Sequence, residues 1–63
     1  MYYYSVKIEW DVLPNTFIQV RSTSTLLEAL KYLDTEFPNK LARIDKVKKY
    51  VYQSDRVVKT YNV

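Results

Sequence analysis

The chain has 63 residues, a net charge of +3, and no cysteine, histidine or glycine. These absences exclude disulfides, histidine or thiolate catalysis, and the glycine-rich loops that bind nucleotide phosphates. Residues 1–63 are expected to form one domain of low stability, and we expect no enzymatic activity, no cofactor and no metal site.

The charge is distributed unevenly along the chain. Residues 1–37 hold three cationic and five acidic side chains, whereas residues 38–63 hold seven cationic and two acidic ones. This asymmetry indicates either an acidic or polyanionic partner or a solvated basic surface. No signal-peptide pattern and no apolar run of membrane-spanning length occurs, so we expect a cytoplasmic protein that binds no membrane.

The first predicted element is a strand over residues 2–12, where every second residue from Tyr2 to Val12 is apolar. A second alternating run follows over residues 16–21. Pro14 and Asn15 supply turn chemistry between the two runs, which predicts a hairpin. The even positions of both strands can share the core face only if the loop has an odd number of residues. We therefore expect a loop of three or five residues centred on Pro14 and Asn15.

A helix is predicted over residues 25–36. Thr25 and Glu28 have the spacing of a capping box, and Pro38 ends the helical run. The apolar residues that fall on one side of this helix are Leu26, Ala29, Leu30, Leu33 and Phe37.

Residues 40–52 fit two patterns. Their apolar residues can form one helical stripe, or a strand whose inward-facing parity changes between Ile44 and Val47. The Tyr50–Tyr52 run favours the strand, with a bulge near Asp45 and Lys46 to explain the change.

A turn at Ser54 and Asp55 then leads into a last strand over residues 56–63. If the turn holds only these two residues, Val58 lies opposite Val51. The predicted fold is α+β, a two-layer ββαββ arrangement in which one helix packs on one face of an antiparallel sheet.

One short helix leaves the other face of such a sheet open, and this face is predicted to be basic and aromatic. Its most informative part is the row of even positions from Lys46 to Tyr52, which alternate to one side of an extended chain. The predicted binding residues are Tyr3, Phe17, Arg21, Lys46, Lys48, Tyr50, Tyr52, Lys59 and Tyr61.

The hairpin, the Ser/Thr-capped helix and the Phe37–Asn39 segment before a strand together resemble small uncharacterised phage and prophage proteins. The resemblance carries no named family and no residue roles. It implies a regulator or inhibitor directed at a host protein, acting in the host cytoplasm.

Two hypotheses of function follow from the predicted open face. In the first, the protein is a protein-interaction module that binds a partner or a second copy of itself as a homodimer. In the second, the tyrosines stack on the bases of a single-stranded nucleic acid while the lysines contact its phosphates. Neither hypothesis involves a small molecule.

Overall fold

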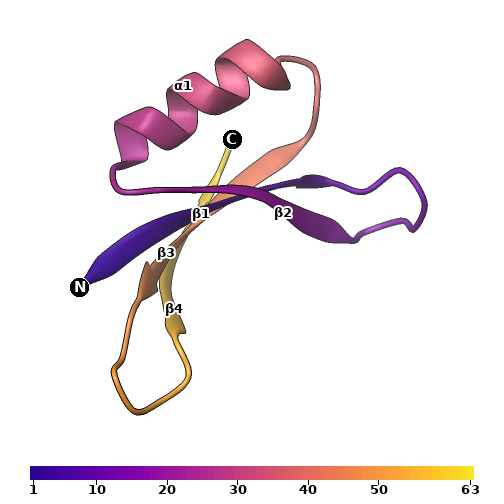
Figure 1. Cartoon of the computed structure of the whole chain (residues 1–63). Coiled ribbons are helices and arrows are strands. Elements are labelled where there is room, and N and C mark those ends of the chain that lie inside the picture. The colour runs from indigo at the N-terminus through magenta and orange to yellow at the C-terminus, as the bar shows by residue number, and fades with distance from the viewer.

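The computed structural model describes residues 1–63 and confirms the α+β fold, with one four-stranded antiparallel sheet and one helix in the order ββαββ (Figure 1). The elements are β1 (Tyr2–Glu9), β2 (Phe17–Thr23), α1 (Leu26–Glu36), β3 (Ala42–Lys48) and β4 (Arg56–Asn62). The helix lies on one side of the sheet and packs against β1, β2 and β3.

The strand order in the sheet is β2-β1-β3-β4. The chain leaves β2, passes along α1 over the sheet and returns as β3 on the other side of β1. This crossover makes β2 and β4 the two edge strands. The helix α1 lacks the length and apolar character that crossing a membrane would require.

The β1–β2 hairpin confirms the predicted odd loop length. The Trp10 amide donates to the Thr16 carbonyl at 2.8 Å, which encloses the five residues 11–15. Within this loop Asn15 has a φ of 58°, a left-handed conformation that asparagine tolerates better than most residues. The prediction that the first strand reaches Val12 was wrong, because β1 ends at Glu9 and Val12 is 69% exposed.

The helix has the predicted start and end. The Glu28 amide donates to Thr25 Oγ1 at 3.2 Å, so Thr25 is the N-cap, and the Phe37 amide closes the last turn onto the Leu33 carbonyl. Leu33 is buried, but Leu30, which the sequence pattern placed in the core, is 40% exposed because it lies at the edge of the contact with the sheet.

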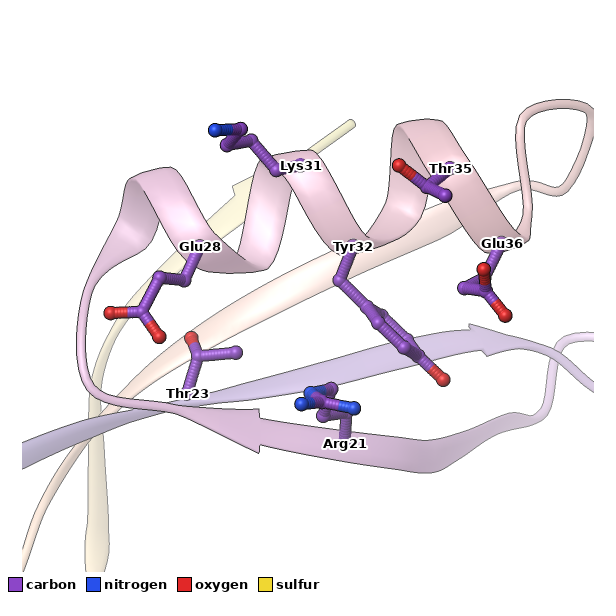
Figure 2. A pocket seen from close by; sticks show the side chains of 7 residues that line it. All are labelled: Arg21, Thr23, Glu28, Lys31, Tyr32, Thr35 and Glu36. Carbon is purple, nitrogen blue, oxygen red and sulfur yellow. The ribbon is translucent and has the colours of Figure 1, made fainter.

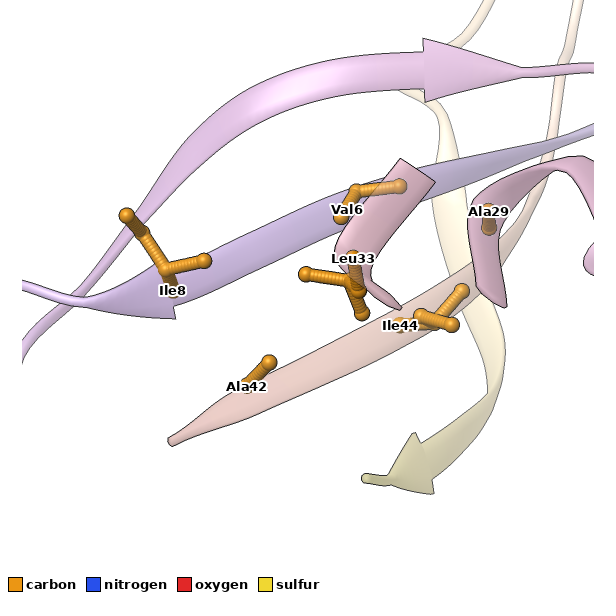
Figure 3. Close-up of a cluster of buried hydrophobic side chains, with 6 residues drawn as sticks. All are labelled: Val6, Ile8, Ala29, Leu33, Ala42 and Ile44. Carbon is orange, nitrogen blue, oxygen red and sulfur yellow. The ribbon is translucent and has the colours of Figure 1, made fainter. Parts of the chain in front are cut away.

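The hydrophobic core lies between α1 and the central strands (Figure 3). Its buried members are Val6, Ile8, Ala29, Leu33, Ala42 and Ile44. Two of the six are alanines, so the apolar volume that stabilises the chain is small.

A bulge in each edge strand changes which side chains share a face. In β2 the pairing moves from Val6 with Arg21 to Lys7 with Gln19, which leaves Val20 as the extra residue. Arg21 therefore lies on the helix side of the sheet. The sequence pattern had placed it on the open face, so that prediction was wrong.

In β4 the extra residue is Val58, because Lys46 pairs with Lys59 whereas the next residue, Val47, pairs with Val57. The strand β3 itself pairs with β1 without interruption. The prediction that this segment forms a strand is confirmed, and the prediction of a bulge near Asp45 and Lys46 was wrong.

The same segment is also shorter than predicted. Because β3 ends at Lys48, the Tyr50–Tyr52 run belongs to the loop between β3 and β4. Val51 is 85% exposed there and has no partner in β4, so the predicted pairing of Val51 with Val58 was wrong.

Candidate functional site: a basic strip beside the helix

The register of β3 and β4 brings four cationic side chains together. Lys46 lies opposite Lys59, and Lys48 lies opposite Arg56. Residues two apart on a strand share a face, so Lys46 and Lys48 lie on the same side as Ile44, which is buried in the core under α1. These cations therefore occupy the helix side of the sheet, at the end that the core does not reach.

Tyrosine rings lie beneath these cations. The Nζ atom of Lys46 is 4.6 Å from the centroid of the Tyr2 ring, and that of Lys59 is 4.9 Å from the centroid of Tyr61. Lys48 Nζ lies 5.3 Å from the Tyr50 ring. We call this surface the basic strip; its residues are Tyr2, Lys46, Lys48, Tyr50, Arg56, Lys59 and Tyr61.

No carboxylate neutralises the basic strip. The ion pairs of the structure join Lys7 and Arg43 to Asp45, and Lys40 to Asp11, so none of them involves a strip residue. The cations of the strip therefore present their positive charge to solvent, with only the faces of the tyrosine rings as partners.

The Asp55 carboxylate lies near one end of the strip but shapes the loop instead. Its oxygens accept hydrogen bonds from the Tyr50 amide at 3.3 Å and from the Tyr3 hydroxyl at 3.1 Å. Partial burial and the neighbouring Asp55 carboxylate raise the pKa of the Tyr3 phenol above its usual value. These two contacts hold the β3–β4 loop against the start of β1.

The face of the sheet away from the helix was predicted to be basic, but its cations surround a buried carboxylate. At its centre Asp45, which is 2% exposed, accepts hydrogen bonds from the Lys7 ammonium and, at 2.7 Å, from the Thr60 hydroxyl. Burial by itself raises the pKa of Asp45, but the hydrogen bonds from Lys7 and Thr60 outweigh it and hold that pKa below the usual value. The charges on this face are thus largely compensated within the chain.

Five of the nine binding residues predicted from the sequence meet in the basic strip: Lys46, Lys48, Tyr50, Lys59 and Tyr61. They lie on the helix side, so the prediction that they occupy the open face was wrong. The reason is that Lys46 and Lys48 share the parity of the core residue Ile44, not that of Val47, whose side chain lies on the other face.

The other four predicted residues lie outside the strip. Tyr3 and Phe17 are on the open face, where the Arg43 guanidinium lies 5.1 Å from the Phe17 ring. Tyr52 is 96% exposed in the β3–β4 loop. Arg21 lies on β2, at the opposite edge of the sheet.

Arg21 belongs to a shallow groove between α1 and β2, shown in Figure 2. Its guanidinium lies 4.9 Å from the centroid of the Tyr32 ring, which reaches down from the helix. The groove also holds Lys31 together with Glu28 and Glu36, so cationic and acidic side chains are balanced there. This balance distinguishes the groove from the basic strip, and Arg21 serves to pack the helix edge.

The sequence pattern missed two strip residues, Tyr2 and Arg56. Tyr2 was assigned to the core because it continues the apolar alternation of β1, but the core stops short of it and the ring is 46% exposed. Arg56 is three residues from Lys59 and would lie on the opposite side of a regular strand. The bulge at Val58 changes the parity of β4 and places both side chains on the helix side. No glycine or proline marks that bulge in the sequence.

Comparison of the chain with protein-family models, with curated proteins and with solved structures finds no match to any of the three.

Proposed function

We propose that this chain is a small non-enzymatic binding protein that uses the basic strip to bind an acidic surface of a partner protein. The observation that carries this proposal is the pair of like-charged contacts across β3 and β4, Lys46 with Lys59 and Lys48 with Arg56, which lack any carboxylate partner.

Such contacts oppose folding. Like charges directly across an antiparallel pair destabilise it, typically by a few tenths to about 1 kcal/mol each. The tyrosine rings under the cations offset part of this cost, because an exposed cation–π contact contributes about 0.5–1 kcal/mol. Repulsion that no other contact in the protein compensates is typical of a functional surface. Carboxylates of a bound partner would compensate it here.

The composition of the strip suits a protein partner. Tyrosine and arginine are the residue types that contribute most to protein interfaces. Lys46 lies over the face of the Tyr2 ring and Lys59 over that of Tyr61, so these ring faces are less available for stacking with nucleic-acid bases.

The resemblance to phage and prophage proteins supports a finer proposal about the partner. On this proposal the protein is a phage-type inhibitor in the host cytoplasm that covers an acidic surface of a host protein. Self-association through two strips is disfavoured because it would bring eight cations together, so a homodimer would have to use another surface.

Single-stranded nucleic acid is the second candidate ligand. The observation that favours it is the repetition of Lys46 and Lys48 along one side of β3, with no neutralising carboxylate. Single-strand binding proteins combine a positively charged groove that follows the phosphate backbone with aromatic side chains on which the bases stack.

Affinity capture with a matched charge control tests the proposal. Tagged wild-type protein, Lys46→Glu and Lys31→Glu are used to capture partners from a host lysate, with half of each sample treated with nuclease. Lys31 lies on the exposed side of α1, so the two variants change the net charge equally but only one alters the strip.

We expect wild type and Lys31→Glu to retain the same protein after nuclease treatment and Lys46→Glu to lose it. Loss of the captured protein from the wild-type sample on nuclease treatment would favour the second candidate. Equal capture by all three proteins would show that the strip is not the binding surface.

A further inference from the structure

We infer that β4 binds its partner by strand addition, taking up an extended acidic segment as a fifth strand of the sheet. This inference rests on the proposed function and adds the mode of binding and the chemistry of the segment.

The outer edge of β4 has free backbone groups. The Val63 amide donates to the Ala42 carbonyl at 3.1 Å, which makes Val63 and Ala42 a hydrogen-bonded pair of the β3–β4 ladder. Backbone groups along a strand alternate in direction, so those of Thr60 and Asn62 point away from β3. In the sheet order β2-β1-β3-β4 no strand lies on that side.

The side chains of β4 are exposed as well. Six of its seven residues are exposed and only Tyr61 is half-buried, whereas α1 packs against the other three strands. The second edge strand, β2, lies under the helix, with Arg21 held against Tyr32. Figure 1 shows the β3–β4 loop and the first part of β4 projecting away from the helix, whereas the chain end after β4 returns toward α1, where Val63 lines a pocket with Leu30 and Leu33. A strand that joined β4 would therefore have open space along most of its length and would run beside α1 only at the end near Val63.

Charge decides which segment can join this edge. A residue directly opposite Lys59 on an added strand would lie on the helix side of the sheet, with its Cβ atom about 5 Å from that of Lys59. Carboxylates at alternate positions of the added strand would therefore meet Lys59 and Arg56, with the cations of β3 one strand behind them. These contacts would replace the like-charge repulsion of the free protein with attraction.

The same charges exclude the commonest alternative occupant, a second copy of β4. Antiparallel pairing of two β4 strands would bring the Lys59 and Arg56 side chains of both copies onto one edge with no carboxylate. Lysine on an edge strand is a known device against such self-pairing. Strand addition by an extended peptide is a recognised binding mode in which backbone hydrogen bonds supply affinity and side chains supply selectivity.

Backbone methylation of a synthetic ligand tests this mode. The probe is a peptide of alternating glutamate and threonine, about ten residues long, which matches the upper length of ordinary strands. Two further versions carry N-methyl groups, one on every threonine and the other on every glutamate. All three peptides have the same charge, but in each methylated version the amides of only one edge are blocked. Binding is measured by fluorescence anisotropy, with an oligothymidylate of similar length as a nucleic-acid control.

We expect one methylated peptide to bind about tenfold or more weakly than the parent and the other to bind about as well, because two or more backbone hydrogen bonds are lost on only one edge. Threonine methylation is the damaging change if the added strand is antiparallel to β4, since the threonines then face Thr60 and Asn62. Hydrogen exchange at the Thr60 and Asn62 amides should slow when the parent peptide is bound.

Equal binding of all three peptides, with no added protection of these amides, would overturn strand addition. In that outcome, loss of peptide binding in Lys46→Glu would still support the strip as an acidic-protein site. Tighter binding of the oligothymidylate than of the parent peptide would instead overturn both the acidic segment and the proposed protein partner.

Discussion

Lys46 of β3 lies directly opposite Lys59 of β4, and neither ammonium has a carboxylate within salt-bridge distance. Each covers the face of a different tyrosine ring, Tyr2 for Lys46 and Tyr61 for Lys59. The neighbouring row repeats the arrangement with Lys48 and Arg56. Positive charge is therefore concentrated where the strand ladder itself would favour pairs of opposite sign.

Truncation of the core at Leu33 should be severely destabilising. Leu33 is 4% exposed and packs between α1 and the central strands, so Leu33→Ala is expected to lower the free energy of unfolding by about 2–5 kcal/mol. Urea denaturation followed by circular dichroism measures the loss. The matched control is Leu27→Ala on the same helix, which is 67% exposed and should change stability by no more than about 0.5 kcal/mol. Similar losses in both variants would contradict the described core.

The stability of the protein should decrease at low pH partly through Asp45. The folded-state pKa of this carboxyl is lowered, so its contribution to stability is complete above the unfolded value of about 3.9 and is lost as the pH falls through the folded value. Asp45→Asn should therefore be less stable than wild type near pH 6 and lose less stability on acidification. Asp34→Asn, at an exposed position on α1, is the control. Identical pH profiles for wild type and Asp45→Asn would rule out this role.

The two loop tyrosines should differ in their effect on binding. Tyr50 lies under Lys48 and Arg56, whereas Tyr52 is 96% exposed and outside the basic strip. Tyr50→Ala is expected to weaken partner binding by about tenfold, as for a moderate interface hot spot, and Tyr52→Ala by less than about twofold. Isothermal titration with the captured partner measures both. A larger effect from Tyr52→Ala would move the binding surface to the tip of the loop.

The parts of the fold that depend on local sequence could be predicted. The capping box of Thr25 and Glu28, the stop at Pro38 and the apolar alternation of β1 each act over a few residues, and the helix, the hairpin and the α+β class followed from them. The clustering of Lys46, Lys48 and Lys59 was also visible, since it needed only the alternation of two paired strands.

The side of the sheet on which that cluster lies could not be predicted. The sequence suggested a bulge at Asp45 and Lys46, but β3 is regular, so Lys46 and Lys48 keep the parity of Ile44. The bulges lie instead in the edge strands, at Val20 and Val58, where they decide the sides on which Arg21 and Arg56 lie. Both bulges occur at valine, an ordinary strand residue, so no turn-forming residue marks them. The end of β3 at Lys48 was also hidden, because Tyr50–Tyr52 has high strand propensity, whereas in the structure the Tyr50 amide donates to the Asp55 carboxylate of the loop.

The measurement that tests the role of the basic strip most directly is the paired determination of stability and partner binding for Lys59→Glu. This change converts the contact with Lys46 from like to opposite charge but also removes the cation–π contact of Lys59 with Tyr61. Because relief of the repulsion and the new attraction together outweigh the lost contact, the free energy of unfolding is expected to rise by about 0.5 kcal/mol while partner binding falls by at least about tenfold. A variant that is no more stable than wild type and binds the partner equally well would contradict the account.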